Sequence, residues 1–273
     1  HEGYSSQPVH SFWDDLFAVR GLAHAVIGAE VLGETAAAKR IAALRDTLRA
    51  DLHAAVAAAL TRHGIEFIPG SVELGDFDPT STSIAFDPCE EAERFPRAAL
   101  VHTFERYWEE LEARRAGRAP NDGYTPYEIR NATALLRLGW KDRALAQLEW
   151  LLGDQRPPAW CQWPKVSWRE QRAARDLGDL PHGWVASSFV RTVRRLVAYE
   201  REAAGALVIG AGIPAGWVRD PAGVRVRALP TPYGPLSVTI TAASAPLGDG
   251  EVVRFAFERG PCAPPGGVEL ISP

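Results

Sequence analysis

Two kinds of helical segment alternate along most of this chain, and this alternation constrains the fold more than any other feature of the sequence. Segments of the first kind are amphipathic, with apolar residues three or four positions apart on one side and charged residues on the other. Segments of the second kind are apolar on nearly all sides, which predicts burial all round. The amphipathic segments span about 36–60, 96–115 and 141–152, and the apolar ones span about 12–31, 80–86, 129–138 and 185–197.

Short linkers join these segments, so we expect sequential helices to pack as antiparallel hairpins of one inner and one outer helix. Repeated hairpins of this kind close most naturally into a two-layered toroid, the (α/α)6-type barrel. Roughly three and a half hairpins are visible in the 273 residues, fewer than a closed six-hairpin barrel needs. The sequence also begins without a methionine and contains none. We therefore expect a partial toroid from a processed fragment, with the missing N-terminal part of its own parent chain as a partner.

The composition of the sequence changes at Leu207. From there on glycine and proline are frequent, and β-branched residues alternate with other residues. Three such runs, separated by turn signals, span 224–227, 236–240 and 252–257. This pattern predicts short strands in a small sheet. We expect a mainly α chain of two domains, the toroid portion at 1–206 and a β-rich domain at 207–273.

Composition and charge exclude several classes of partner. The net charge of −4 gives no reason to expect nucleic acid or an anionic membrane surface. No apolar run reaches the roughly 18 residues of a membrane span. The 3 cysteines form no pair that predicts a zinc site or a disulfide framework, and no phosphate-loop, dinucleotide or metalloprotease motif is present. We therefore expect no metal or cofactor, and without a targeting segment the compartment, cytoplasmic or secreted, stays open.

The unusual polar and aromatic residues gather just before each apolar helix or in its first turn, in the segments 11–15, 73–81, 123–131 and 178–184. Because the inner helices of a hairpin toroid run parallel, their N-termini meet at one end of the barrel, where these loops would form a single funnel. Aromatic rings stack on the C–H faces of sugars, and carboxylates, arginine and asparagine bind the hydroxyls. The sequence therefore predicts a carbohydrate site. The candidate substrate-binding residues are Trp13, Asp76, Asp78, Tyr124, Arg130, Asn131, Trp163, His182 and Trp184.

The acidic candidates also have a structural interpretation as helix caps. Ser11 and Asp14 have the spacing of a capping box. Thr125 and Glu128 have the same spacing, with a proline at the first helical position between them. Asp78 precedes another such proline, and acidic residues in a first turn also complement the helix dipole. The repetition of one arrangement at four successive apolar helices favours a functional role.

Two aromatic features leave both alternatives open. Trp13 and Trp184 could be core residues, and a lone histidine such as His182 is more often structural than catalytic. The segment 160–170 carries three tryptophans within nine positions and fits neither a helix nor a strand. It could form a wall of a sugar-binding cleft or a plug that packs against the end of the barrel.

At these loops the sequence resembles the six-hairpin glycosidase superfamily, which includes α-L-rhamnosidases, trehalases and glucoamylases. The segment 11–15, SFWDD, is similar to the superfamily's aromatic–Asp loop, which in several families carries the general acid. The segment 178–184, GDLPHGW, is similar to the Gly/His/Trp start of the last inner helix, and 224–240 resembles the C-terminal β-domain of the rhamnosidase-like branch. The resemblance covers nearly the whole chain. It implies a glycoside hydrolase that acts on an oligosaccharide or glycoconjugate.

Inverting hydrolysis of a glycosidic bond uses a protonated acid and an ionised base, with carboxyl groups about 6.5–9.5 Å apart and a water between the base and the sugar. With this resemblance, Asp15 is the expected general acid, and Asp14 is the neighbour that raises its pKa or binds sugar. The second carboxylate of such enzymes commonly follows a tryptophan closely. Here Trp163 is followed by Pro164 and Lys165.

This departure leaves Glu170 or Glu128 as the base, or no base at all, and it keeps three rival functions open. A non-catalytic glycan-binding protein on the same scaffold would bind sugars without turnover. A glycoside phosphorylase would use phosphate in place of water and would need an anion site, for which Lys165, Arg169 and Arg172 are candidates. A helical scaffold that binds protein would have no affinity for sugars.

Overall fold

The computed structural model describes residues 7–120, 125–153, 155, 157–164, 180–244, 251–259 and 262–273. Contacts divide the chain into two compact units, His1–Ser188 and Phe189–Pro273. The first unit is helical and the second contains the strands, so the expected mainly α chain with a small β-rich C-terminal part is confirmed. Within these described ranges, no helix is long and apolar enough to cross a membrane.

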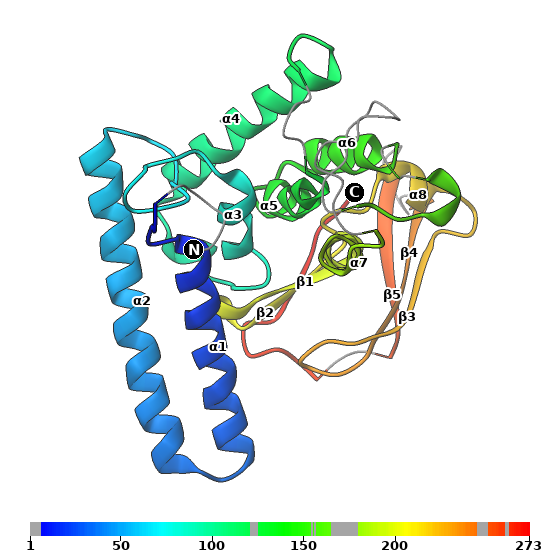
Figure 1. Cartoon of the computed structure of the whole chain (residues 1–273). Helices are drawn as coiled ribbons and strands as arrows, with labels where there is room; N and C mark the ends of the chain where they lie inside the picture. Colours follow the sequence, from blue (N-terminus) through cyan, green and yellow to red (C-terminus); the bar gives the residue numbers. More distant parts are fainter. Residues whose placement is uncertain are drawn as a thin grey trace. The chain divides into compact units, whose positions relative to one another are not determined.

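The first unit begins with a long helical hairpin. Helix α1 (Phe12–Val31) and helix α2 (Thr35–His63) run antiparallel and side by side (Figure 1). α2 ends at Gly64, whose φ of 62° is a left-handed conformation that glycine adopts without a steric cost. The two helices occupy the positions that the sequence predicts for the first inner and outer segments.

The other helical elements follow in the order that the alternation predicts. They are α3 (Pro79–Thr82), η1 (Ser83–Ala85), η2 (Ala92–Arg94), α4 (Arg97–Arg115), η3 (Pro126–Arg130), α5 (Asn131–Arg137), α6 (Lys141–Leu152), η4 (Pro158–Trp160) and α7 (Gly183–Val197). The second apolar segment forms two short turns, α3 and η1, in place of one longer helix. Pro88 gives a physical reason, because it disfavours the helical conformation at Asp87 and has no N–H to donate.

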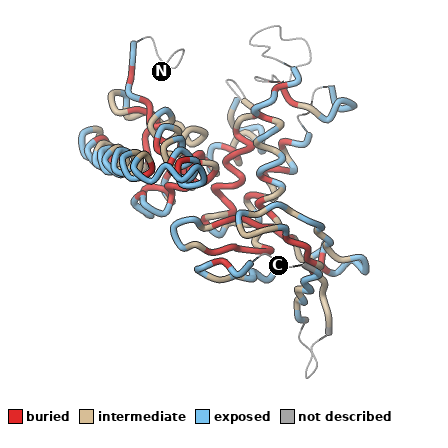
Figure 2. Tube along the Cα trace, turned by 90° about the horizontal axis from the view of Figure 1, so that it is seen from below, coloured by how far each residue is buried: buried red, intermediate tan, exposed pale blue. Residues whose placement is uncertain are grey.

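Burial on every side, expected for the apolar segments, holds for α5 but is wrong for α1 and α7. Each residue from Asn131 to Leu136 is buried. On α1, however, Ile27 is 56% exposed and Val31 is 81% exposed, and on α7 Val190 is 65% exposed. Figure 2 shows exposed and buried positions following one another along the helices. An apolar residue can be buried without cost, but its type alone does not determine whether it is buried. That depends on which other elements pack against it.

In the second unit, the described strands form two three-stranded sheets. In the first sheet, β1 (Ala198–Arg201) is antiparallel and β6 (Val268–Leu270) is parallel to the central strand β2 (Ala206–Ile209). The second sheet is antiparallel, with the order β3 (Val224–Leu229), β4 (Leu236–Ser244) and β5 (Glu251–Arg259). These last three strands contain the alternating runs that the sequence predicts. The turn η5 (Glu202–Ala204) and helix α8 (Ala215–Arg219) lie between the strands in sequence.

A hydrophobic core joins the two sheets of the second unit. Ile209 from β2, Val218 from α8 and Val238 from β4 are buried in it, and Val197 at the end of α7 packs against it. The last turns of α7 therefore belong with the strands. This packing explains why the division between the units falls at 188/189. The change in composition of the sequence suggests a later boundary, near 206.

The burial pattern predicts opposite outcomes for two leucines of the first unit. Leu135 on α5 is fully buried, so Leu135→Ala should lower the free energy of unfolding by about 2–5 kcal/mol. Leu44 on α2 belongs to an apolar stripe in the sequence but is exposed, so Leu44→Ala should change it by less than about 0.5 kcal/mol. Urea unfolding followed by far-UV circular dichroism measures both. Equal losses for the two variants would contradict the described packing.

Candidate functional site

Three helix starts from distant parts of the sequence meet around the side chain of Arg130. The guanidinium carbon of Arg130, the last residue of η3, lies 4.6 Å from the ring centroids of both Trp13 and Tyr127. It lies 5.8 Å from the ring centroid of Trp184, at the start of α7. The rings of Trp13 and Trp184 stack on each other, with centroids 6.0 Å apart and planes inclined by 25°. We call these four residues, together with His182, the Arg130 cluster.

The Arg130 cluster presents an aromatic surface with a cation beneath it. Trp184 is 51% exposed, whereas Arg130 is 8% exposed. Burial lowers the pKa of Arg130 to about 10, which leaves the guanidinium charged at neutral pH. His182 is buried, and its Nε2 lies 2.5 Å from the hydroxyl oxygen of Tyr127, so these two side chains are linked by a hydrogen bond. Of the four segments that the sequence predicts to converge, 11–15, 123–131 and 178–184 contribute residues to this cluster. The fourth, 73–81, contributes no ring to it among the described residues.

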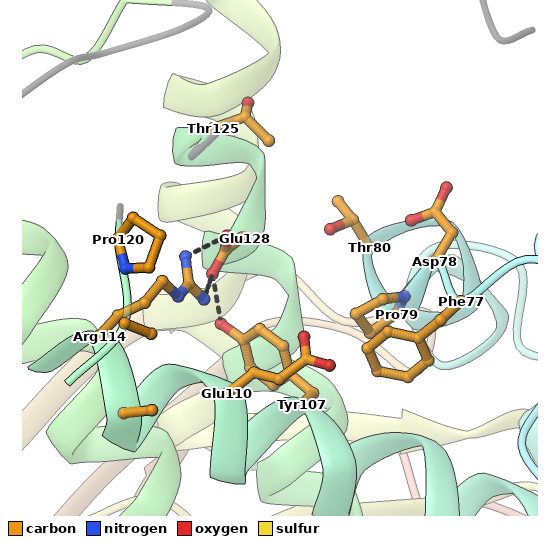
Figure 3. Close-up of a pocket in the computed structure, with 12 residues that line it drawn as sticks. Phe77, Asp78, Pro79, Thr80, Tyr107, Glu110, Arg114, Pro120, Thr125 and Glu128 are labelled. Atoms are coloured by element: carbon orange, nitrogen blue, oxygen red, sulfur yellow. Dashed lines mark hydrogen bonds and ion pairs between the residues drawn. The ribbon is translucent and has the colours of Figure 1, made fainter. Parts of the chain in front are cut away.

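A cleft of about 460 Å³ is the second feature of the first unit (Figure 3). Arg114, Thr125 and Glu128 lie on one side of it, and Phe77, Asp78 and Thr80 lie on the opposite side (Figure 3). We call this space the carboxylate cleft; its lining residues are Phe77, Asp78, Pro79, Thr80, Tyr107, Glu110, Ala113, Arg114, Ala119, Pro120, Thr125 and Glu128. The turn η3 thus contributes to two sites, because Glu128 lines the cleft while Tyr127 and Arg130 belong to the Arg130 cluster.

Glu128 is held by a nearly buried ion pair at the cleft wall. Its Oε1 accepts a hydrogen bond from Nη1 of Arg114 at 2.8 Å, and its Oε2 accepts one from Nη2 at 2.7 Å. Tyr107 donates a further hydrogen bond to Oε2 at 2.9 Å. Burial, followed by the charge of Glu128, raises the pKa of Tyr107 well above its usual value, so its hydroxyl stays a donor. Gln147 completes the network with a 2.8 Å hydrogen bond to the Tyr107 hydroxyl.

These contacts favour a structural role for Glu128 over the role of a general base. Both carboxylate oxygens already accept hydrogen bonds from Arg114, and one of them also accepts a hydrogen bond from Tyr107, so Glu128 is engaged within the cleft wall. The capping-box interpretation is not realised either. Thr125 caps η3 by accepting a hydrogen bond from the backbone N–H of Tyr127 at 3.3 Å, while the Glu128 carboxylate binds Arg114.

The start of α1 places two carboxylates in different surroundings. Asp14 is exposed and Asp15 is partly buried. Burial, followed by the negative charge of Asp14, raises the pKa of Asp15, and His10 opposes this weakly. His10 itself is bound to Glu73, with 2.5 Å between Nδ1 and a carboxylate oxygen. Ser11 makes no capping hydrogen bond with its side chain, so the capping box proposed for Ser11 and Asp14 is not formed.

Asp76 and Asp78 both have structural partners. The hydroxyl of Ser71 donates a hydrogen bond to Asp76 at 2.7 Å within the loop before α3. Asp78 is the N-cap of α3, because it accepts a hydrogen bond from the backbone N–H of Ser81 at 2.9 Å. The helix-start interpretation of Asp78 is therefore confirmed, and Asp78 also lines the carboxylate cleft. Asp76 does not line it.

Asn131 and Trp163 lie where a ligand at the surface could not reach them. Asn131 is fully buried at the start of α5, beside Tyr107. Trp163 is buried, and its indole N–H donates a hydrogen bond to the carbonyl oxygen of Leu151 at 2.9 Å. This position of Trp163 fits the plug that packs on the helices and does not fit the wall of a cleft. Tyr124 and Glu170, together with Lys165, Arg169 and Arg172, lie outside the described residues.

Sequence reasoning missed Tyr107, Arg114 and Gln147, which hold Glu128 in place. Tyr107 and Arg114 lie seven positions apart on α4, so they project from the same face two turns apart. The feature of the sequence that indicates this role is the position of Arg114, a charged residue at the end of the apolar stripe of α4. The amphipathic pattern of 96–115 predicts that the charged residues of α4 face solvent, and Arg114 is an exception to this pattern.

Comparison with protein-family models, with curated proteins and with solved structures finds no match to this chain. Among the described residues, no group of three or more histidine, cysteine, aspartate or glutamate side chains is arranged to hold a metal ion. The features of the first unit that bear on function are the Arg130 cluster, the carboxylate cleft and the start of α1.

The raised pKa of Asp15 predicts a pH-dependent cost to stability. Because the folded unit holds the proton of Asp15 more tightly than the unfolded chain, stability is lost as the pH rises from the unfolded value of 3.8 through the folded pKa. Asp15→Asn should therefore raise the melting temperature at pH 7, and the gain should shrink as the pH falls towards 4. Thermal unfolding of Asp15→Asn beside a variant of the exposed Asp51, Asp51→Asn, measures this. A gain that does not depend on pH would contradict the assignment.

Proposed function

We propose that the first unit is the carbohydrate-binding part of a glycoside hydrolase, with the sugar lying over the Arg130 cluster. The observation that carries this proposal is the convergence of Trp13, Tyr127 and Trp184 on one guanidinium, with Trp184 half exposed. Exposed aromatic faces stack on the C–H surfaces of sugars, and guanidinium and imidazole groups hydrogen-bond to polar substituents. This combination supports an oligosaccharide or glycoconjugate as the substrate.

The raised pKa of Asp15 supports its role as the general acid, because an acid must still be protonated when the reaction begins. Asp15 is two positions beyond Trp13, so the two side chains leave α1 on different sides. Side chains in a helix lean towards its N-terminus, and at the first turn both can contact a molecule that lies over the helix end. The exposed Asp14 would bind sugar hydroxyls beside them.

The base in this proposal is Glu170, because the ion pair with Arg114 disfavours Glu128. We also propose that the helical hairpins form part of an (α/α)6-type toroid, as the resemblance to six-hairpin glycosidases implies. The exposure of Ile27 and Val31 supports the idea that further helices of the parent chain cover α1.

A second candidate function is glycan binding without hydrolysis. The observation that favours it is the engagement of both Glu128 oxygens by Arg114, which removes one of the two candidate bases. The replacement of the expected carboxylate by Pro164 and Lys165 in the sequence points the same way. This candidate predicts saturable binding of the same sugars at the Arg130 cluster with no product formed.

A screen of oligosaccharides and aryl glycosides, with and without phosphate and read by mass spectrometry, tests the proposal. We expect release of a free sugar and a loss of about 10²–10⁴-fold in rate for Asp15→Asn. Trp184→Ala should weaken sugar binding by about tenfold, because it removes one stacking ring. Trp217→Ala is the matched control, since Trp217 is 50% exposed but lies in the second unit.

The outcomes separate the candidates. Full activity of Asp15→Asn would rule out the acid assignment, and a sugar phosphate as product would indicate a phosphorylase. Binding that depends on Trp184 without any product would establish the glycan-binding protein. Equal sugar affinity for Trp184→Ala, Trp217→Ala and the wild type would contradict the proposed site.

A further inference from the structure

Arg130 is a buried cation that is bonded to no carboxylate among the described residues. Its side chain is more than nine-tenths buried, and among the described residues it makes no ion pair and no hydrogen bond, so its contacts are the three aromatic rings. Removing a charged guanidinium from water is costly unless other groups compensate. Cation–π contacts recover part of this cost but leave the N–H donors of the fork without acceptors.

Three other arginines of the described residues each donate hydrogen bonds to a carboxylate. Arg137 donates a hydrogen bond to Glu90 at 2.6 Å, and Arg114 binds Glu128 with both terminal nitrogens. Arg195, in the second unit, donates to Glu200 at 2.9 Å. Arg130 differs from all three. Asp78 and Asp87 attract its charge from a distance, but neither carboxylate is bonded to it.

The guanidinium of Arg130 remains reachable from solvent. Within the described residues, no nitrogen of Arg130 is among the side-chain polar atoms that are both sealed from solvent and without a hydrogen bond. The adjacent Trp184 ring is half exposed. The hydroxyl of Tyr127 is engaged by His182, so it does not compete for a group that approaches Arg130.

We propose that the saccharide recognised at the Arg130 cluster is acidic, and that its carboxylate pairs with the guanidinium of Arg130 while its ring stacks on Trp184. This inference rests on the proposed function, and it names the substrate class as saccharides that contain a uronic acid. A carboxylate accepts two parallel hydrogen bonds from a guanidinium fork, and the low-polarity rings around Arg130 strengthen that pairing. The three rings hold the fork in place before the ligand arrives, so little side-chain freedom is lost on binding.

Isothermal titration calorimetry with a matched pair of ligands tests this inference. The pair is a set of uronic acid oligosaccharides and the same oligosaccharides after reduction of their carboxyl groups to hydroxymethyl groups. We expect the acidic form to bind at least about tenfold more tightly, with an affinity that falls as the salt concentration rises. Inorganic phosphate serves as a third ligand, to separate binding of a sugar carboxylate from binding of any small anion.

Three variants make the assignment specific. Arg130→Met should abolish the preference for the acidic form while keeping an apolar side chain among the rings. Arg130→Lys keeps the charge without the planar fork, and we expect it to retain only part of the preference. Arg62→Met, at an exposed position on α2, is the control and should leave the preference unchanged. Near-UV circular dichroism of each variant verifies that the aromatic cluster is folded.

Each outcome bears on one claim. Equal affinity for the acidic and reduced forms, or a preference that survives Arg130→Met, would overturn this inference and leave the carbohydrate proposal standing. Phosphate binding that depends on Arg130 without any preference for uronic acids would also overturn it. If neither form of the oligosaccharide binds, the inference and the proposed function fail together.

Discussion

The ion pair between Arg114 and Glu128 is the interaction on which the arrangement of the first unit depends. Both side chains are nearly buried, with 13% and 11% of their surface exposed, and both terminal nitrogens of the guanidinium donate to the carboxylate. The pair fixes η3 against helix α4. η3 in turn carries Tyr127 and Arg130, so one contact on the cleft side determines where the aromatic cluster forms on the other side. Tyr107 and Gln147 reinforce the same contact.

This arrangement explains how an arginine can be held beside two stacked tryptophans with no carboxylate bonded to it among the residues that the structure describes. The rings of Trp13, Tyr127 and Trp184 restrict the guanidinium, and the anchored η3 segment prevents Arg130 from swinging out to water. A site that keeps an unpaired charge in place carries a cost in stability, as does a carboxyl such as Asp15 whose pKa is raised. Costs of this kind are characteristic of binding and catalytic sites, because folding alone gives no reason to keep them.

Periodicity in the sequence predicted the order of the helices and the strands β3, β4 and β5, because spacing of apolar residues depends on local geometry. It failed on the environment of α1, where Ile27 and Val31 are exposed, since no local pattern shows which elements cover a helix. For the site, the helix starts brought Trp13, Arg130, His182 and Trp184 together as expected. The role of Arg114 depends on a tertiary contact across 14 positions of sequence, which no local pattern shows. For the segment of Trp163 the sequence left a cleft wall and a plug open, and the burial of Trp163 fits the plug.

Amide hydrogen exchange over residues 125–131 tests the central claim most directly. Arg114→Met leaves Glu128 charged and unpaired in a nearly buried place, which costs about 3–5 kcal/mol and should accelerate exchange in this segment by about a hundredfold or more. Arg115→Met, which breaks a more exposed ion pair with Glu112 one residue further along α4, should leave the exchange of 125–131 unchanged. If the amides of residues 125–131 exchange at the same rate in Arg114→Met as in Arg115→Met, the ion pair does not anchor η3.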